Sequence, residues 1–194
     1  MASVTWVINK EESSIHFRIR QYEVSMVNGV YSKIEGMLEA DGNWQIQALV
    51  LNVQADSIDT FSKERDRYIR SERVCNVAKF PFITFYSTAV RAIGTGGKFE
   101  VKGNLSVRDL TRPVYLDVQL KNRVRVDDTL VRMDLEWFGS ISRKSFCLPA
   151  DTRTTDACGA LEDEVSLHGR IFVDRMLDEK GIVQWPTQRS GSME

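Results

Sequence analysis

Several kinds of residue and sequence pattern are scarce or missing in this chain of 194 residues. Its 3 cysteines, Cys75, Cys147 and Cys158, are an odd number and lie far apart, which argues against a disulfide framework and favours a reducing compartment. No two of them form a CxxC pair, so the sequence predicts no zinc site and no other metal. There are only 2 histidines, His16 and His168, and both fall on the polar phase of their segments, where exposed surface histidines are expected.

Charge of one sign and long apolar runs are also missing. The formal net charge is -1, so the chain as a whole lacks the positive potential that nucleic-acid binding needs. No apolar run approaches the ~18 residues of a transmembrane helix. The first residues show no basic region followed by an apolar stretch, so we expect a cytoplasmic protein. A periplasmic or secreted location is the alternative if the chain is a trimmed mature form.

Catalytic motifs are missing as well. We find no G-x-S-x-G nucleophile elbow, no H-E-x-x-H, no phosphate-binding glycine loop and no dinucleotide-binding fingerprint. The sequence therefore predicts a non-enzymatic protein without a cofactor.

What the sequence does have is alternation of apolar and polar residues with a period of two. It is clear in Ile15–Arg20 and recurs in runs centred on residues 51, 85, 103, 117, 134 and 169. Turn signals such as Gly94–Gly97 separate the runs, and about eight or nine antiparallel strands result. Because nearly every strand has one apolar and one polar side, a single closed sheet explains the pattern better than a sandwich.

One short helical insert interrupts the strands, roughly from Phe61 to Glu72. Asp59 or Thr60 is expected to cap it, with Phe61 on its apolar flank. Its basic residues have two interpretations: a solvated face, or a basic rim that attracts a phosphate or carboxylate head group. Rim candidates are Arg65, Arg67, Arg70 and, from a later strand, Arg143. Arg65 and Asp66 are also expected to fasten the insert to the barrel.

Several segments together resemble the YceI-like family of lipid- or polyisoprenoid-binding proteins. Similar to the family's motifs are Ser57–Thr60 with Arg65-Asp66, Gly29–Gly36, Lys79–Phe85, Val101–Val107 with Thr111–Val114, and Ile141–Leu148. The resemblance covers most of the chain, from Trp6 to about Val173. It departs from the pattern at Gln21, Arg67–Ile69, Arg73–Val77, Ser145 and Cys147.

The resemblance implies an all-β, lipocalin-like, eight-stranded antiparallel barrel over residues 1–176. Because the alternating pattern decays after Val173, a poorly ordered tail is expected over 177–194. It implies a long-chain isoprenoid or fatty lipid as partner, bound for sequestration or transport, and a homodimer. The expected lining residues are Ile15, Phe17, Ile19, Leu49, Leu51, Val53, Phe85, Val101, Leu105, Leu116, Val118, Met133, Leu135 and Val173.

Three alternatives stay open at this point. The barrel interior of eight strands can be filled by side chains, so the same residues could form an ordinary core. A lipid- or quinone-modifying enzyme could use the same cavity. A barrel with a filled core could instead bind proteins through the helical insert and the long segment from Pro149 to Glu162.

Overall fold

The computed structural model describes residues 3–21, 25–149 and 161–177. Helices and strands follow in the order β1 (Val4–Ile8), β2 (Ser14–Gln21), β3 (Ser25–Tyr31), β4 (Ile34–Ala40), β5 (Ile46–Gln54), the 3-10 turn η1 (Ala55–Ser57), β6 (Ile58–Asp59), α1 (Lys63–Arg70), β7 (Phe82–Ile93), β8 (Lys98–Val107), β9 (Leu110–Arg125), β10 (Leu130–Ser142), the 3-10 turn η2 (Lys144–Phe146) and β11 (Leu161–Met176). The tail expected beyond residue 177 and most of the segment from Pro149 to Glu162 lie outside the described residues.

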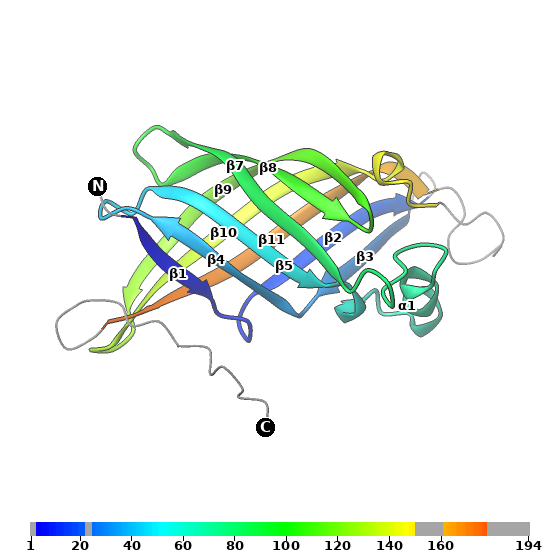
Figure 1. Ribbon diagram of the computed structural model, residues 1–194, viewed down its shortest axis with the longest axis horizontal. Helices are drawn as coiled ribbons and strands as arrows, with labels where there is room; N and C mark the ends of the chain where they lie inside the picture. The colour runs from blue at the N-terminus through cyan, green and yellow to red at the C-terminus, as the bar shows by residue number, and fades with distance from the viewer. Residues whose placement is uncertain (1–2, 22–24, 150–160, 178–194) are drawn as a thin grey trace, which may run out of the picture.

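These strands form one antiparallel sheet that closes on itself into an eight-stranded barrel (Figure 1). Around the barrel the order is β1, β4, β5, β7, β8, β9, β10 and β11, and β11 pairs back to β1. The expected fold class is therefore confirmed. Closure satisfies the backbone N–H and C=O groups that an open edge would leave unpaired.

The remaining short strands prolong three of the eight. β2 continues β1, because both pair with β11. β3 continues β4, because β4 pairs with β1 and β3 pairs with β2. β6 continues β5, because β5 pairs with β4 and β6 pairs with β3. The interruptions lie at residues 9–13, 32–33 and 55–57, on adjacent strands. Two hydrogen bonds link the last two interruptions: Gln54 N–H donates to the Lys33 carbonyl at 2.9 Å, and Lys33 N–H donates to Ser57 Oγ at 3.2 Å.

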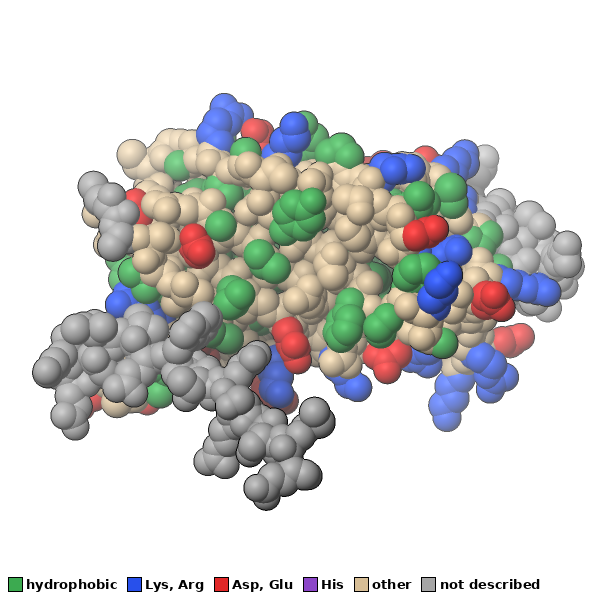
Figure 2. All heavy atoms as spheres, viewed as in Figure 1, with side chains coloured by type: hydrophobic (Ala, Val, Ile, Leu, Met, Phe, Trp, Pro, Cys, Tyr) green, Lys and Arg blue, Asp and Glu red, His purple; other side chains and the backbone are tan. Residues whose placement is uncertain are grey.

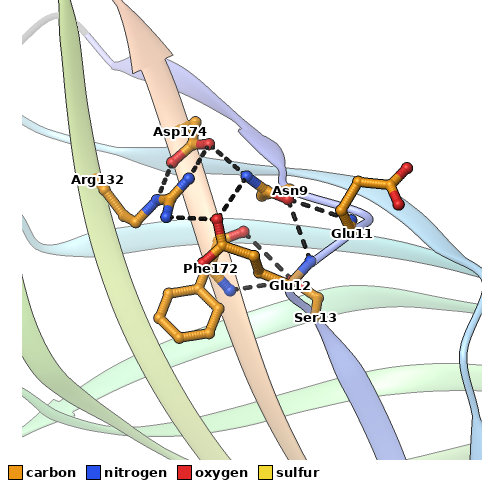
Figure 3. A network of polar contacts seen from close by, with 7 residues as sticks. All are labelled: Asn9, Glu11, Glu12, Ser13, Arg132, Phe172 and Asp174. Atoms are coloured by element: carbon orange, nitrogen blue, oxygen red, sulfur yellow. Dashed lines mark hydrogen bonds and ion pairs between the residues drawn. The ribbon is translucent and has the colours of Figure 1, made fainter. Parts of the chain in front are cut away.

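A polar network holds the first interruption against the strand that closes the barrel (Figure 3). Arg132 on β10 donates two hydrogen bonds to the Asp174 carboxylate on β11, at 2.6 and 2.8 Å. Asn9 donates to the same carboxylate at 2.9 Å, and its side-chain oxygen accepts from the backbone of Glu11 and Glu12. Arg132 also reaches Glu12 at 2.7 Å. The bidentate ion pair joins β10 to β11, and Asn9 and Glu12 tie the loop between β1 and β2 to this pair.

α1 lies at one end of the barrel, opposite the β7–β8 hairpin (Figure 1). The helix begins later than expected, because Ser62 and not Asp59 or Thr60 provides the cap, accepting from Arg65 N–H at 3.4 Å. Phe61 is consequently outside the helix and 80% exposed, so its expected place on an apolar flank is wrong.

Arg65 and Asp66, which were expected to anchor the insert, both form hydrogen bonds with Thr60. The buried Asp66 carboxylate accepts from the backbone N–H and the hydroxyl of Thr60 at 2.9 and 2.6 Å. Arg65 donates to the hydroxyl and carbonyl of the same residue at 2.8 and 2.7 Å. Arg70, expected to face outward, instead donates to the backbone carbonyls of Asp56 and Ile58, which fastens the end of α1 to η1 and β6.

The Asp174 carboxylate gives a test of barrel closure. Burial raises its pKa, but the hydrogen bonds from Arg132 and Asn9 outweigh burial and leave the pKa below its ordinary value. A depressed folded pKa stabilises the fold above the unfolded pKa of about 3.9, and this stabilisation disappears as pH falls through the folded pKa. We expect Asp174→Asn to lower the free energy of unfolding by about 1–2 kcal/mol at neutral pH. Urea titrations should show this difference shrinking toward zero in acid.

Glu11→Gln is the matched control, because it makes the same acid-to-amide change on the same loop, where only the backbone of Glu11 joins the network. Equal stability of Asp174→Asn and wild type at neutral pH would contradict the role assigned to this ion pair.

Candidate functional site

The two halves of the barrel interior are filled differently. In the half away from α1, side chains from every wall meet and pack completely, and Leu38, Val101, Met133 and Val173 are 0% exposed. In the half next to α1, the walls enclose a cavity of about 210 Å³. The interior is therefore a solid core at one end and a hollow at the other.

Eight of the residues expected to line a ligand site border this cavity. They are Ile15, Phe17, Ile19, Leu51, Val53, Phe85, Leu105 and Leu116. The other six belong to the packed half or its boundary and do not border the cavity: Leu49, Val101, Val118, Met133, Leu135 and Val173. All of them point inward, as the alternation predicts, so the difference is one of position along the strand.

The basic candidates divide in the same way. Arg65 on α1 and Arg143 after β10 border the cavity, whereas Arg67 and Arg70 do not. Arg67 is exposed on the outer side of α1, and Arg70 is engaged with backbone carbonyls at η1 and β6.

Sequence reasoning missed further lining residues. On the strands they are Val27, Tyr31, Ile58, Ile83, Val107, Val114, Trp137, Ile141, Leu161, Val165 and Leu167; around them are Tyr68, Ile69, Val74, Cys75, Leu148 and Pro149. Several of the strand residues share the inward phase and could have been found from it. Helical spacing does place Tyr68 and Ile69 on the apolar flank of the predicted helix, but no periodic signal marks Val74 and Cys75. These residues reach the cavity because the α1 segment crosses this end of the barrel.

Three aromatic rings keep the hollow half open by lying against the wall. Phe17 is the direct cross-strand partner of Gly29, and Trp137 is the partner of Gly169. A Cβ on Gly29 would lie 2.3 Å from the Phe17 ring, and one on Gly169 would lie 2.1 Å from the Trp137 ring. Phe85 covers Gly103 in the same manner. Because glycine has no side chain, each ring occupies the space over its neighbour and leaves the centre of the barrel free.

The cavity wall is apolar apart from a few polar groups. Burial raises the pKa of the Tyr31 phenol, and it raises the pKa of the Cys75 thiol to about 11 although Arg108 nearby opposes the change. Both groups are therefore neutral near neutral pH. The two arginines carry the charge at the wall, because a guanidinium stays protonated.

Arg143 is the more deeply placed of the two arginines, with 8% of its surface exposed. Its guanidinium donates to the backbone carbonyls of Leu148 and Glu162. Among the residues that the structure describes, neither Arg143 nor Arg65 forms an ion pair with a carboxylate. Asp163 is a nearby negative charge: hydrogen bonds from Lys144 and Ser142 lower the pKa of its carboxyl, and Arg143 adds to that shift. An anion in the cavity would give Arg143 a direct ionic partner.

Groups typical of catalysis or metal binding lie elsewhere. No Asp, Glu or His within residues 3–21, 25–149 and 161–177 borders the cavity. His16 and His168 stack on the outer wall with ring centres 6.1 Å apart. Over residues 3–21, 25–149 and 161–177, no group of three His, Cys, Asp or Glu side chains could hold a metal ion.

Comparison with known proteins agrees with this architecture. The model of the YceI-like domain matches residues 6–172. This chain belongs to the YceI-like family. Protein YceI of Salmonella newport is 31% identical over 147 residues, which cover 74% of this chain and 76% of that protein.

Solved structures of YceI-like barrels share the fold at lower identity. BcnA of Burkholderia cenocepacia has a TM-score of 0.69 at 18% identity, over 85% of this chain and 98% of that one. A polyisoprenoid binding domain from Saccharophagus degradans has a TM-score of 0.62 at 14% identity, over 87% of this chain and 97% of that one.

Gly29 offers a direct test of how the cavity stays open. Gly29→Ala places a methyl group where the Phe17 ring lies, so we expect the ring to turn into the cavity and reduce its volume. Overpacking of this kind costs about 1–3 kcal/mol of stability. Titration with the apolar fluorophore N-phenyl-1-naphthylamine should show weaker binding than in wild type.

Gly42→Ala is the control, because nothing lies within 4 Å of a Cβ at that position. If Gly29→Ala binds the fluorophore as well as this control does, the ring does not govern the space in the cavity.

Proposed function

We propose that the hollow half of the barrel binds the chain of a long isoprenoid or fatty ligand, which the protein sequesters or transports without altering it chemically. The apolar cavity with two arginines at its wall is the observation that carries the proposal. Membership of the YceI-like family supports it, as does the fold shared with a domain described as polyisoprenoid binding.

The size of the cavity and the energetics of binding together favour a long chain. A volume of about 210 Å³ exceeds the ~150 Å³ of engineered cavities that hold benzene, but is below the ~300–1,000 Å³ of common ligand pockets. Burial of each CH₂ contributes about 0.8 kcal/mol, whereas association costs about 4–15 kcal/mol. We infer that the end of the chain enters the cavity and that the remainder extends toward α1.

The arginines then meet the polar end of the ligand. Arg65 and Arg143 border the cavity beside α1, so a phosphate, pyrophosphate or carboxylate at this end would find two guanidinium groups. Arginine suits such head groups because its planar fork donates two parallel hydrogen bonds. Arg67 and Arg70 have no part in this contact.

The alternatives have less support. A lipid- or quinone-modifying enzyme needs a general base or nucleophile facing the guest. In the described part of the chain, the ionisable groups that border the cavity are two guanidiniums, two phenols and one thiol. A filled protein-binding barrel does not account for the hollow half. The homodimer and the cytoplasmic location stay predictions; in the described part of the chain, no helix is long and apolar enough to span a bilayer.

Filling the cavity tests the proposed function directly. Mass spectrometry of an organic extract from the purified wild type should reveal a long-chain lipid. Leu105→Trp adds bulk at the cavity wall, so the extract should lose that lipid and uptake of added farnesol or palmitate should fall at least tenfold, with thermal stability retained.

Val50→Trp is the matched control, because Val50 lies on the outer wall and is 37% exposed. No lipid in the wild-type extract, together with no uptake of farnesol or palmitate, would rule out the proposed function.

Removing the charge of Arg143 tests head-group selection. Arg143→Met should weaken binding of farnesyl phosphate by about 1.5–3 kcal/mol, the range for a hydrogen bond to a charged group. Binding of neutral farnesol should persist, which also shows that the variant is folded.

Arg67→Met should leave both affinities unchanged, since Arg67 does not border the cavity. Isothermal titration with both ligands provides the measurement, and equal losses for phosphate and alcohol would remove Arg143 from head-group recognition.

A further inference from the structure

Phe61, just before α1, is the most exposed large apolar side chain among the described residues. Its exposed fraction is 80%, and its φ of 62° lies in the left-handed region that aromatic residues rarely adopt. Its backbone N–H donates to the Asp59 carboxylate at 2.7 Å, so the local turn is held by its neighbour and not by the ring.

The fold gains nothing from an aromatic residue at this position. Glycine or asparagine adopts a positive φ more readily than phenylalanine does. Either residue would also expose less apolar surface to water. Backbone conformations of this kind persist where the surroundings hold them, and they gather at functional sites. The reason for a phenylalanine at position 61 therefore lies outside the barrel itself.

Basic residues without an ion pair follow Phe61 in the chain. Residues 63–73 contain five basic and three acidic side chains, and one of the three acids, Asp66, is buried against Thr60. None of the five basic residues forms an ion pair within the part of the chain that the structure describes. In Figure 2, Lys and Arg side chains project at the end of the molecule where Figure 1 draws α1.

Other apolar side chains are exposed at the same end. Phe82, the first residue of β7, is 47% exposed, and Met26 near the start of β3 is 48% exposed. The strand ends that carry them border the cavity through Ile83 and Val27. The exposed apolar and basic groups thus surround the end of the barrel at which the cavity lies.

We propose that this end of the barrel docks on an anionic phospholipid bilayer, with Phe61 inserted among the head groups and the α1 cations held over the anionic surface. The proposal rests on the proposed function, because a long apolar guest resides in membranes and has to leave or enter them here. An aromatic ring beside unpaired cations fits a bilayer interface, where apolar burial and attraction to anionic lipid act together.

Vesicle flotation tests the docking, with phosphatidylcholine vesicles that contain either no anionic lipid or about 30% phosphatidylglycerol. Wild type should float with the anionic vesicles only, and about 1 M salt should release it by screening. Phe61→Asn should bind them about tenfold more weakly, while its thermal stability is unchanged or higher because asparagine tolerates the left-handed φ. Arg67→Gln should weaken binding about fivefold.

Two controls make the same chemical changes away from α1. Tyr115→Asn removes an aromatic ring that is 58% exposed on the wall at β9, and Lys98→Gln removes a cation from the hairpin at the opposite end. Both should bind anionic vesicles as wild type does. Wild type that fails to float, or Phe61→Asn that floats unchanged, overturns the docking and leaves a protein partner as the explanation for Phe61.

Uptake of farnesol added without vesicles separates this proposal from the proposed function. Phe61→Asn should take up farnesol as wild type does, because Phe61 does not border the cavity. Uptake without vesicle binding contradicts the docking alone, and vesicle binding without uptake contradicts the proposed function alone.

Discussion

The structure depends on the pairing of β11 with both β1 and β2. These hydrogen bonds join the last long strand to the first and turn a curved sheet into a closed barrel. Closure brings every inward-facing side chain to one axis, so the number and size of those side chains decide how much space is left. The ion pair between Arg132 and Asp174 supports this seam from outside, on the wall away from the cavity.

The same barrel has a packed core at one end and a hollow at the other because the inward-facing side chains differ between the two ends. Side chains such as Leu38 and Met133 meet in the packed half and contribute hydrophobic stabilisation to the fold. In the hollow half, the space that rings could fill is left free because each ring covers a glycine on the neighbouring strand. The proposed binding of a guest would need both parts, since the packed half stabilises a barrel whose other half gives up internal contacts.

Much of this could be predicted from the sequence. Alternation identified the strands and the inward face, because a side chain's direction in a strand depends only on whether its position is odd or even. Alternation carries no information about distance along the barrel, so Val101 and Leu105 looked equivalent although only Leu105 borders the cavity. Pairing of Phe17 with Gly29 depends on register, which a single sequence does not reveal.

The α1 segment was harder to predict for a different reason. Thr60 carries the hydroxyl typical of a helix cap, but Asp66 and Arg65 engage it, and Ser62 takes the capping role. Arg70 turns toward backbone carbonyls that are neighbours only in three dimensions. Such tertiary contacts override local propensity, and they explain why the expected apolar flank at Phe61 is wrong.

The three strand interruptions lie next to one another, and this has a mechanical consequence. Residues 9–13, 32–33 and 55–57 form a crease across one wall, where regular ladder bonds give way to side-chain links such as Lys33 to Ser57. A wall with such a crease bends there at less cost than an unbroken sheet does. Bending at this crease would alter the width of the hollow half, where the proposed guest would lie.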